Sequence, residues 1–80
     1  MKAKIHITLK NGVLDPQGKA IEGALSHLGF DNVGAVRQGK YIELELDGKP
    51  GKETEAMVES MCRKLLANTV VENYRFELVE

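Results

Sequence analysis

The chain has 80 residues and a formal net charge of −1, from 11 basic and 12 acidic side chains. This length predicts one domain, residues 1–80, which is small enough to be marginally stable alone. It contains two tyrosines, two phenylalanines and no tryptophan. Balanced charge and few aromatic rings argue against nucleic acid as a partner, because nucleic-acid-binding domains rely on basic surfaces and stacking rings.

The composition also disfavours a membrane protein and a secreted one. No segment approaches the roughly 18 apolar residues of a membrane-spanning helix. The first residues lack the apolar run of a signal peptide. A single cysteine, Cys62, cannot form a disulfide within the chain. We therefore expect a cytoplasmic protein that makes no contact with a membrane.

The first third of the chain predicts a strand, a loop and a helix. Apolar and polar residues alternate over residues 3–10, with the period of a strand that has one buried face. Asp15 is a suitable helix N-cap, Pro16 suits the first helical position, and Gly29 is expected to end the helix. One face of this helix carries an apolar stripe: Ala20, Ile21, Ala24, Leu25 and Leu28.

The remainder predicts a hairpin, a second helix and a last strand. Alternation over residues 33–37 and 41–46, separated by a turn at Gln38-Gly39, is typical of a β-hairpin. A helix is expected from about Lys52 to Ala67, with acidic residues in its first turn and basic residues in its last. A strand over residues 70–79 follows. The buried stripe of the second helix is predicted to contain Met57, Val58, Met61, Cys62, Leu65 and Leu66.

The order β-α-β-β-α-β predicts an α+β fold. It is typical of a two-layer α/β sandwich of the ferredoxin-like type, in which two helices cover one face of a four-stranded antiparallel sheet. The opposite face is predicted to be mainly polar, with Lys4, His6, Glu43, Glu45 and Arg75 among its residues. We expect this face or a sheet edge to serve self-association of so small a domain. A fully solvated face is the alternative.

The loop between the first strand and the first helix, residues 10–18, is the first candidate for function. It carries Gly12, Gly18 and the capping Asp15, yet it also carries Val13 and Leu14. A simple turn does not need two apolar side chains. These side chains must pack beneath the loop or contact another molecule, and loops on a rigid scaffold commonly carry function.

The residue types that perform catalysis do not gather in this sequence. His6 and His27 are expected on different layers, and Cys62 falls in a buried stripe, where a thiolate is disfavoured. Glu43 and Glu45 are expected to face basic residues of a neighbouring strand. There is neither a Cys-x-x-Cys pair nor a glycine-rich phosphate loop. We therefore expect no catalytic residues, cofactor site or metal site in this chain.

Several binding families share the predicted fold, so the fold alone does not decide the function. An RNA-recognition domain needs aromatic residues on its central strands, and the strand over residues 3–9 has none. A copper carrier needs paired cysteines in the first loop. A regulatory domain of the ACT type, which binds amino acids, stays compatible because Gly12 and Gly18 would let a ligand approach the backbone. A stand-alone enzyme is a further alternative.

Three blocks of sequence point to a family. Residues 13–18 read Val-Leu-Asp-Pro-Gln-Gly, with Ala20-Ile21, Leu25 and Gly29-Phe30 after them. Residues 36–44 contain Val-Arg-Gln-Gly-Lys and Ile-Glu-Leu, and residues 61–74 contain Met-Cys-Arg-Lys-Leu-Leu-Ala-Asn and Val-Glu-Asn-Tyr. Over essentially its whole length the sequence resembles the PurS subunits of bacterial and archaeal formylglycinamide ribonucleotide amidotransferase. Thr69 is a departure, because the family often has proline there.

The resemblance implies a part in purine biosynthesis. The enzyme, phosphoribosylformylglycinamidine synthase, is a ligase that converts formylglycinamide ribonucleotide, glutamine and ATP into formylglycinamidine ribonucleotide, glutamate, ADP and phosphate. A glutaminase subunit releases ammonia, and a large synthetase subunit uses ATP and magnesium. PurS subunits have no known active site or cofactor of their own. They form dimers or tetramers and bridge the other two subunits.

We expect the contacts with partner subunits to lie in the first loop and in the turn after residue 36, because both are rich in glycine. The candidate contact residues are Asn11, Gly12, Leu14, Asp15, Pro16, Gly18, Arg37, Gly39 and Lys40. A purely structural role is the alternative. In that interpretation Asp15 caps the helix, Gly18 allows close packing, and Arg37 pairs with a carboxylate of the sheet.

Overall fold

The computed structural model describes all residues, 1–80, and centres on a three-stranded antiparallel sheet. The strands are β1 (Lys2–Leu9), β2 (Gly39–Glu45) and β3 (Glu72–Val79), in the order β2-β1-β3. The helices are α1 (Pro16–His27) and α2 (Lys52–Met61), and α2 continues into a π-helical turn, η1 (Cys62–Leu66). The α+β class and the antiparallel sheet of a ferredoxin-like fold are confirmed. None of the helices has the length and apolar character needed to span a membrane.

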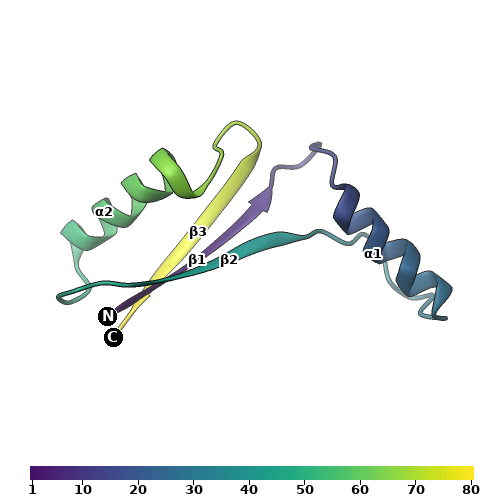
Figure 1. Ribbon diagram of the computed structural model, residues 1–80, viewed down its shortest axis with the longest axis horizontal. Helices are drawn as coiled ribbons and strands as arrows, with labels where there is room; N and C mark the ends of the chain where they lie inside the picture. Colours follow the sequence, from purple (N-terminus) through teal and green to yellow (C-terminus); the bar gives the residue numbers. More distant parts are fainter.

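The core lies between the sheet and α2. Ala3, Ile5 and Ile7 of the central strand are fully buried, as the alternation predicts, and Val58 and Cys62 cover them from the helical layer. Figure 1 shows α2 lying across one face of the sheet. Other apolar side chains surround this centre and are partly buried: Ile42, Leu44, Leu46, Leu66, Tyr74, Phe76 and Leu78.

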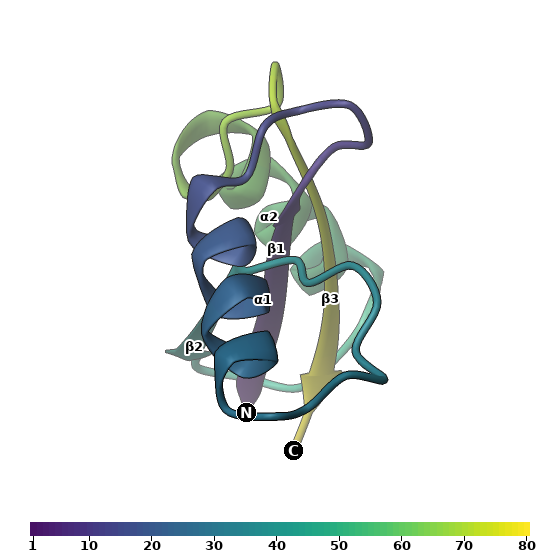
Figure 2. The same cartoon turned by 90° about the vertical axis from the view of Figure 1, so that its right-hand side faces the viewer.

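Helix α1 does not cover the sheet, so the prediction that both helices pack on one face is wrong for α1. It leaves the end of β1 and projects away, and residues 28–35 return beside it (Figures 1 and 2). We call residues 16–35 the arm. The Cα radius of gyration is 16.0 Å, whereas a compact domain of this length has a radius of about 12 Å. Most of the apolar stripe predicted for this helix is therefore left exposed: Leu28 is 73% exposed and Ile21 38%, whereas Leu25 is half-buried.

The predicted strand over residues 33–37 and the turn at Gln38-Gly39 are also absent. A two-residue hairpin turn needs backbone with positive φ, and the residues that have it are Gly12, Gly29 and Gly48. The chain instead runs past Gln38 straight into β2. The sheet therefore has three strands, in the order β-α-β-α-β, where the sequence predicts four. Gly29, with φ of +96°, ends α1 as predicted.

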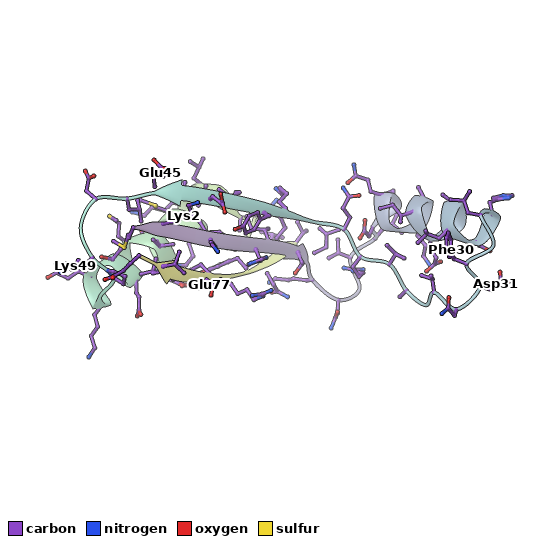
Figure 3. The ribbon with its side chains drawn as sticks, turned by 90° about the horizontal axis from the view of Figure 1, so that it is seen from below. Lys2, Phe30, Asp31, Glu45, Lys49 and Glu77 are labelled. Atoms are coloured by element: carbon purple, nitrogen blue, oxygen red, sulfur yellow. The ribbon has the colours of Figure 1, made fainter.

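The open face of the sheet is polar, as predicted (Figure 3). Lys2 forms an ion pair with Glu43 across the β1–β2 ladder, at 3.5 Å. The Tyr41 hydroxyl donates a hydrogen bond to Glu43 at 2.7 Å, which lowers the pKa of that carboxyl. His6 lies beside the Tyr41 ring, with 4.9 Å between the ring centroids. These side chains therefore have partners within the sheet.

The second helix departs from its predicted stripe near its C-terminal end. Ala67 N donates to Cys62 O at 2.9 Å, an i→i+5 bond that marks a π-helical turn. The wider turn leaves Leu65 outside the core, whereas Leu66 and Ala67 still pack against it. Cys62 stays buried, whereas Leu65 is 82% exposed.

Truncation of Ile5 tests whether the sheet and α2 alone hold the fold. Ile5→Ala removes buried methyl groups from the centre of β1, and we expect it to lower the free energy of unfolding by about 2–5 kcal/mol. Urea denaturation at fixed protein concentration measures this loss. Lys64→Ala, at an exposed position of η1, is the control and should change stability little. A loss for Ile5→Ala as small as that of the control would contradict this description of the core.

Candidate functional site

The base of the arm is organised by Asp15. Its side chain accepts a hydrogen bond from Gly18 N at 2.8 Å, which caps α1, and another from Gln38 N at 2.9 Å. Residues 15 and 38 stand at the two points where the chain enters and leaves the arm. Asp15 is 7% exposed. One buried carboxylate therefore holds together both ends of the arm.

The surroundings of Asp15 favour its ionised form. The N–H groups of Gln38 and Gly18 lower the pKa of the carboxyl, and the nearby Arg37 guanidinium lowers it further. Hydrogen bonds to a charged acceptor are stronger than those between neutral groups. The tie between α1 and residue 38 is therefore made by a carboxylate at neutral pH.

Arg37 makes a second tie at the same place. Its Nη2 donates to the carbonyl oxygens of Leu9 and Lys10, each at 3.1 Å, and its Nη1 donates to Val13 O at 3.3 Å. A planar guanidinium fork can reach several acceptors at once. The predicted pairing of Arg37 with a carboxylate of the sheet is wrong, because its partners are backbone carbonyl oxygens.

Two glycines allow close approaches at this site. A Cβ at Gly18 would lie 2.3 Å from Val36 O and 2.7 Å from an oxygen of the Asp15 carboxylate. A Cβ at Gly39 would lie 2.3 Å from Ile7 O. Gly18 lets the returning chain lie against the start of α1, and Gly39 lets β2 join β1. These positions need glycine for space and not for positive φ.

The remaining candidate residues surround these ties on the surface. Asn11, Gly12, Leu14, Pro16 and Lys40 are all exposed. Leu14 is 76% exposed, so the loop does not bury it, whereas its neighbour Val13 is half-buried. Lys40 pairs with Glu72 at 3.2 Å. The structure thus brings all nine candidates together around the base of the arm. Asp15 and Gly18 are buried there, whereas Arg37 and Gly39 are exposed like the other five.

The hollows at this site are shallow and their polar groups are already paired. One of about 240 Å³ lies beside Asp15, with Gln17, Gln38, Lys40 and Glu72 in its wall. Gln38 donates to Gln17, Lys40 pairs with Glu72, and Asp15 is fully engaged. No buried side-chain polar atom lacks a hydrogen-bond partner. The hollow presents paired side chains to a ligand and no free reactive group.

The candidate nucleophile of the sequence is poorly placed for chemistry. Cys62 is buried in the core, and desolvation together with the nearby Glu59 raises the pKa of its thiol. A raised pKa keeps the thiol protonated and unreactive at neutral pH.

Sequence reasoning missed the most conspicuous surface, which is the arm itself. Its exposed apolar side chains include Ile21, Leu28, Phe30 and Val33, and Leu14 lies at its base. Figure 3 shows Phe30 and Asp31 at the far end, away from the sheet. The periodicity of residues 20–28 correctly indicates an apolar stripe. It cannot indicate whether that stripe packs within the chain or on another molecule.

The tie made by Asp15 predicts a pH dependence of stability. Because the folded state lowers the pKa of Asp15 below its ordinary value of 3.8, the stabilisation is complete above that value. It is lost as pH falls from there through the folded pKa. We expect Asp15→Asn to have a lower Tm than the wild-type chain at pH 7, and the difference to shrink in acid.

Thermal denaturation at several pH values measures that difference. Asp31→Asn, at an exposed position of the arm tip, is the matched control and should follow the wild-type curve. A Tm difference for Asp15→Asn that stays constant down to the lowest pH would show that the carboxylate charge is not what holds the arm.

Comparison with known proteins places this geometry in a family. The family model PurS, described as phosphoribosylformylglycinamidine (FGAM) synthase, matches residues 2–80. The PurS subunit of that synthase from Bacillus subtilis is 47% identical over 79 residues, which cover 99% of this chain and 93% of the relative.

Solved structures agree with the sequence match. The C2 crystal form of Bacillus subtilis PurS superposes with a TM-score of 0.86 at 47% identity, and the match covers 99% of this chain and 98% of that one. A chain in the structure of PurLQS from Thermotoga maritima superposes with a TM-score of 0.87 at 32% identity, covering 98% and 95%. The chain therefore belongs to the PurS family, the small subunits of phosphoribosylformylglycinamidine synthase.

Proposed function

We propose that this chain is an adaptor that bridges the glutaminase and large synthetase subunits of the synthase in the cytoplasm and supports the transfer of ammonia between them. The observation that carries the proposal is the arm, because it presents apolar side chains that this chain cannot cover. The name PurLQS indicates an assembly of three kinds of subunit that includes one similar to this chain.

The shape of the chain supports association with a second copy, as a dimer or a tetramer. Only 8 of 80 residues are buried, although a small domain needs a core to offset its conformational entropy. The arm adds a row of exposed apolar side chains, among them Ile21, Leu28, Phe30 and Val33. Burying such side chains is worth about 1.5–3 kcal/mol for each one that leaves water completely. Packing the arm against the same surface of another copy would supply the missing core.

The contribution of the adaptor to the reaction is positional. Ammonia released by the glutaminase must reach the synthetase before it escapes to solvent, and holding two sites in register shortens that path. The related Thermotoga maritima subunit belongs to an enzyme classified as EC 6.3.5.3, an ATP-using ligase. We assign ATP and magnesium to the synthetase subunit. No group of three His, Cys, Asp or Glu residues in this chain is placed to hold a metal ion.

We propose that the outward-facing candidates, Asn11, Gly12, Leu14, Pro16 and Lys40, make the contacts with the partner subunits. Leu14 is an apolar side chain held beside polar groups on a fixed loop, as is common for interface residues. Asp15, Gly18, Arg37 and Gly39 would act by fixing the backbone on which those residues stand, Asp15 and Gly18 from buried positions and Arg37 and Gly39 from exposed ones. Residues 1–80 would function as one domain in this role.

Reconstitution tests the adaptor function. The chain is mixed with the glutaminase and synthetase subunits, and synthesis from glutamine is compared with synthesis from added ammonia. We expect glutamine-dependent synthesis to require this chain and ammonia-dependent synthesis to proceed without it. If neither activity responds, the adaptor function fails. The ligand-sensing alternative would then be tested by thermal shift with amino acids and purine metabolites.

Self-association is tested by one substitution at two exposed leucines. Leu28→Asp places a charge on the arm, and Leu65→Asp places the same charge on η1, at a similarly exposed position. We expect Leu28→Asp to weaken the dimer by at least tenfold, because it would bury a charge without a partner, and Leu65→Asp to leave its Kd unchanged. Sedimentation velocity measures both. Loss of association in Leu65→Asp alone would show that the arm is not the interface.

A further inference from the structure

The hydrogen bonds that hold the arm in place are all made at its base. The start of α1 is bound to Asp15, Gln17 is bound to Gln38, and no hydrogen bond or ion pair joins the rest of the arm to the sheet. The far end of the arm lies well away from the strands (Figures 1 and 3). The direction in which the arm leaves the sheet is therefore decided by a few contacts. We call Asp15, Gly18, Val36, Arg37 and Gln38 the junction.

The two charged residues of the junction tie different pairs of segments. Asp15 connects the outgoing chain, at Gly18, to the returning chain, at Gln38. Arg37 connects the returning chain to the segment after β1, through the carbonyl oxygens of Leu9, Lys10 and Val13. The outgoing and returning segments of the arm are thus bound to each other, and the returning segment is also bound to the end of β1. Together these hydrogen bonds limit rotation of the arm relative to the sheet. Either set alone would leave the arm free to rotate about a single point of attachment.

Packing within the junction restricts it further. The backbone of Val36 lies so close to Gly18 that an added Cβ would be 2.3 Å from its carbonyl oxygen. The loop after β1 is anchored in turn, because Lys10 N donates to Val71 O at 2.8 Å. The junction is therefore attached to the β3 side of the sheet as well as to β1.

We propose that the junction is an orientation lock: Asp15 and Arg37 fix the direction of the arm, and thereby set how tightly the arm binds a second copy. The inference rests on the proposed function, in which the arm is the self-association surface. A surface held in its bound direction loses less freedom on association. If the competent direction is populated only part of the time, the apparent Kd rises in inverse proportion. Opening the lock is expected to weaken self-association on the order of tenfold, with no interface side chain removed.

Distance measurement within one chain reports the lock directly. Dyes are attached at Ser26→Cys on the arm and Glu55→Cys on α2, both of which are exposed positions. The buried Cys62 is shielded from labelling. Single-molecule energy transfer is recorded at dilutions where the distances no longer depend on concentration. Sedimentation of the unlabelled chain gives the Kd of self-association.

The variants open the lock in two independent ways. Arg37→Lys keeps the charge but cannot reach three carbonyl oxygens. Gly18→Ala forces Val36 and the Asp15 carboxylate away from residue 18 without removing any hydrogen-bonding group. Each has a matched control. Lys19→Gln changes a charge on the arm that pairs only with Glu22, and Gly23→Ala adds a Cβ where nothing lies within 4 Å. Circular dichroism checks that every variant keeps its helices.

The lock predicts that Arg37→Lys and Gly18→Ala both broaden the distribution of arm-to-sheet distances and raise the Kd, while Lys19→Gln and Gly23→Ala leave the distribution narrow. A raised Kd with an unchanged distribution would overturn the proposal, because the substituted residues would then act at the interface itself. A broadened distribution with an unchanged Kd would overturn it too. Failure of the wild-type chain to self-associate would instead refute the proposed function and remove the effect of the lock on Kd.

Discussion

The architecture depends on two hydrogen bonds that the Asp15 carboxylate accepts, one from Gly18 N and one from Gln38 N. Most helix caps satisfy one or two N–H groups of their own helix and are local features. Asp15 caps α1 and also accepts from Gln38 N, 23 residues further along the chain. The hydrogen bond from Gln38 N makes this helix cap a tertiary contact, because it joins the two ends of the chain segment that forms the arm. Without it α1 would be a short helix on two flexible connections, and an isolated helix of this length is barely stable in water.

The constraint explains why the chain is extended and still ordered. Usually a helix in a ferredoxin-like fold is fixed by burying its apolar stripe on the sheet. Here the polar ties at the base of α1 perform that fixing and leave the stripe free. The sheet and α2 form a small core around Ile5, Ile7, Val58 and Cys62, which is a separate source of stability. The chain therefore has two parts. Apolar packing holds the sheet and α2 together, and hydrogen bonds at the base of α1 hold the arm.

Sequence reasoning succeeded where the signal was local. Alternation over residues 3–9 predicted β1 and its buried face, and Asp15, Pro16 and Gly29 marked both ends of α1. It failed where the outcome depended on distant partners. The alternation at residues 33–37 looks like a strand, yet whether it becomes one depends on an edge to pair with and on a turn at Gln38-Gly39. In the structure Gln38 N is bound to Asp15, and the chain continues from Gln38 directly into β2 without a turn. Leu65 was misplaced for another reason, since regular α-helical periodicity does not predict the π-helical turn that rotates it outward.

The candidate site shows the same limit at the level of function. Glycine content and apolar loop residues drew attention to residues 11–18 and 37–40, and the structure brings these two segments together. What the sequence could not separate is which residues face outward and which hold them in place. Leu14 and Asp15 are neighbours, yet Leu14 is 76% exposed and Asp15 is 7% exposed. An adaptor needs both kinds, because a contact residue is useful only if its backbone is held at a fixed position relative to the partner. In this chain Arg37 holds the loop and Asp15 holds the arm, and both residues belong to the junction. The surface proposed for partner subunits and the surface proposed for self-association therefore rest on the same junction, and a change that strains it would affect both.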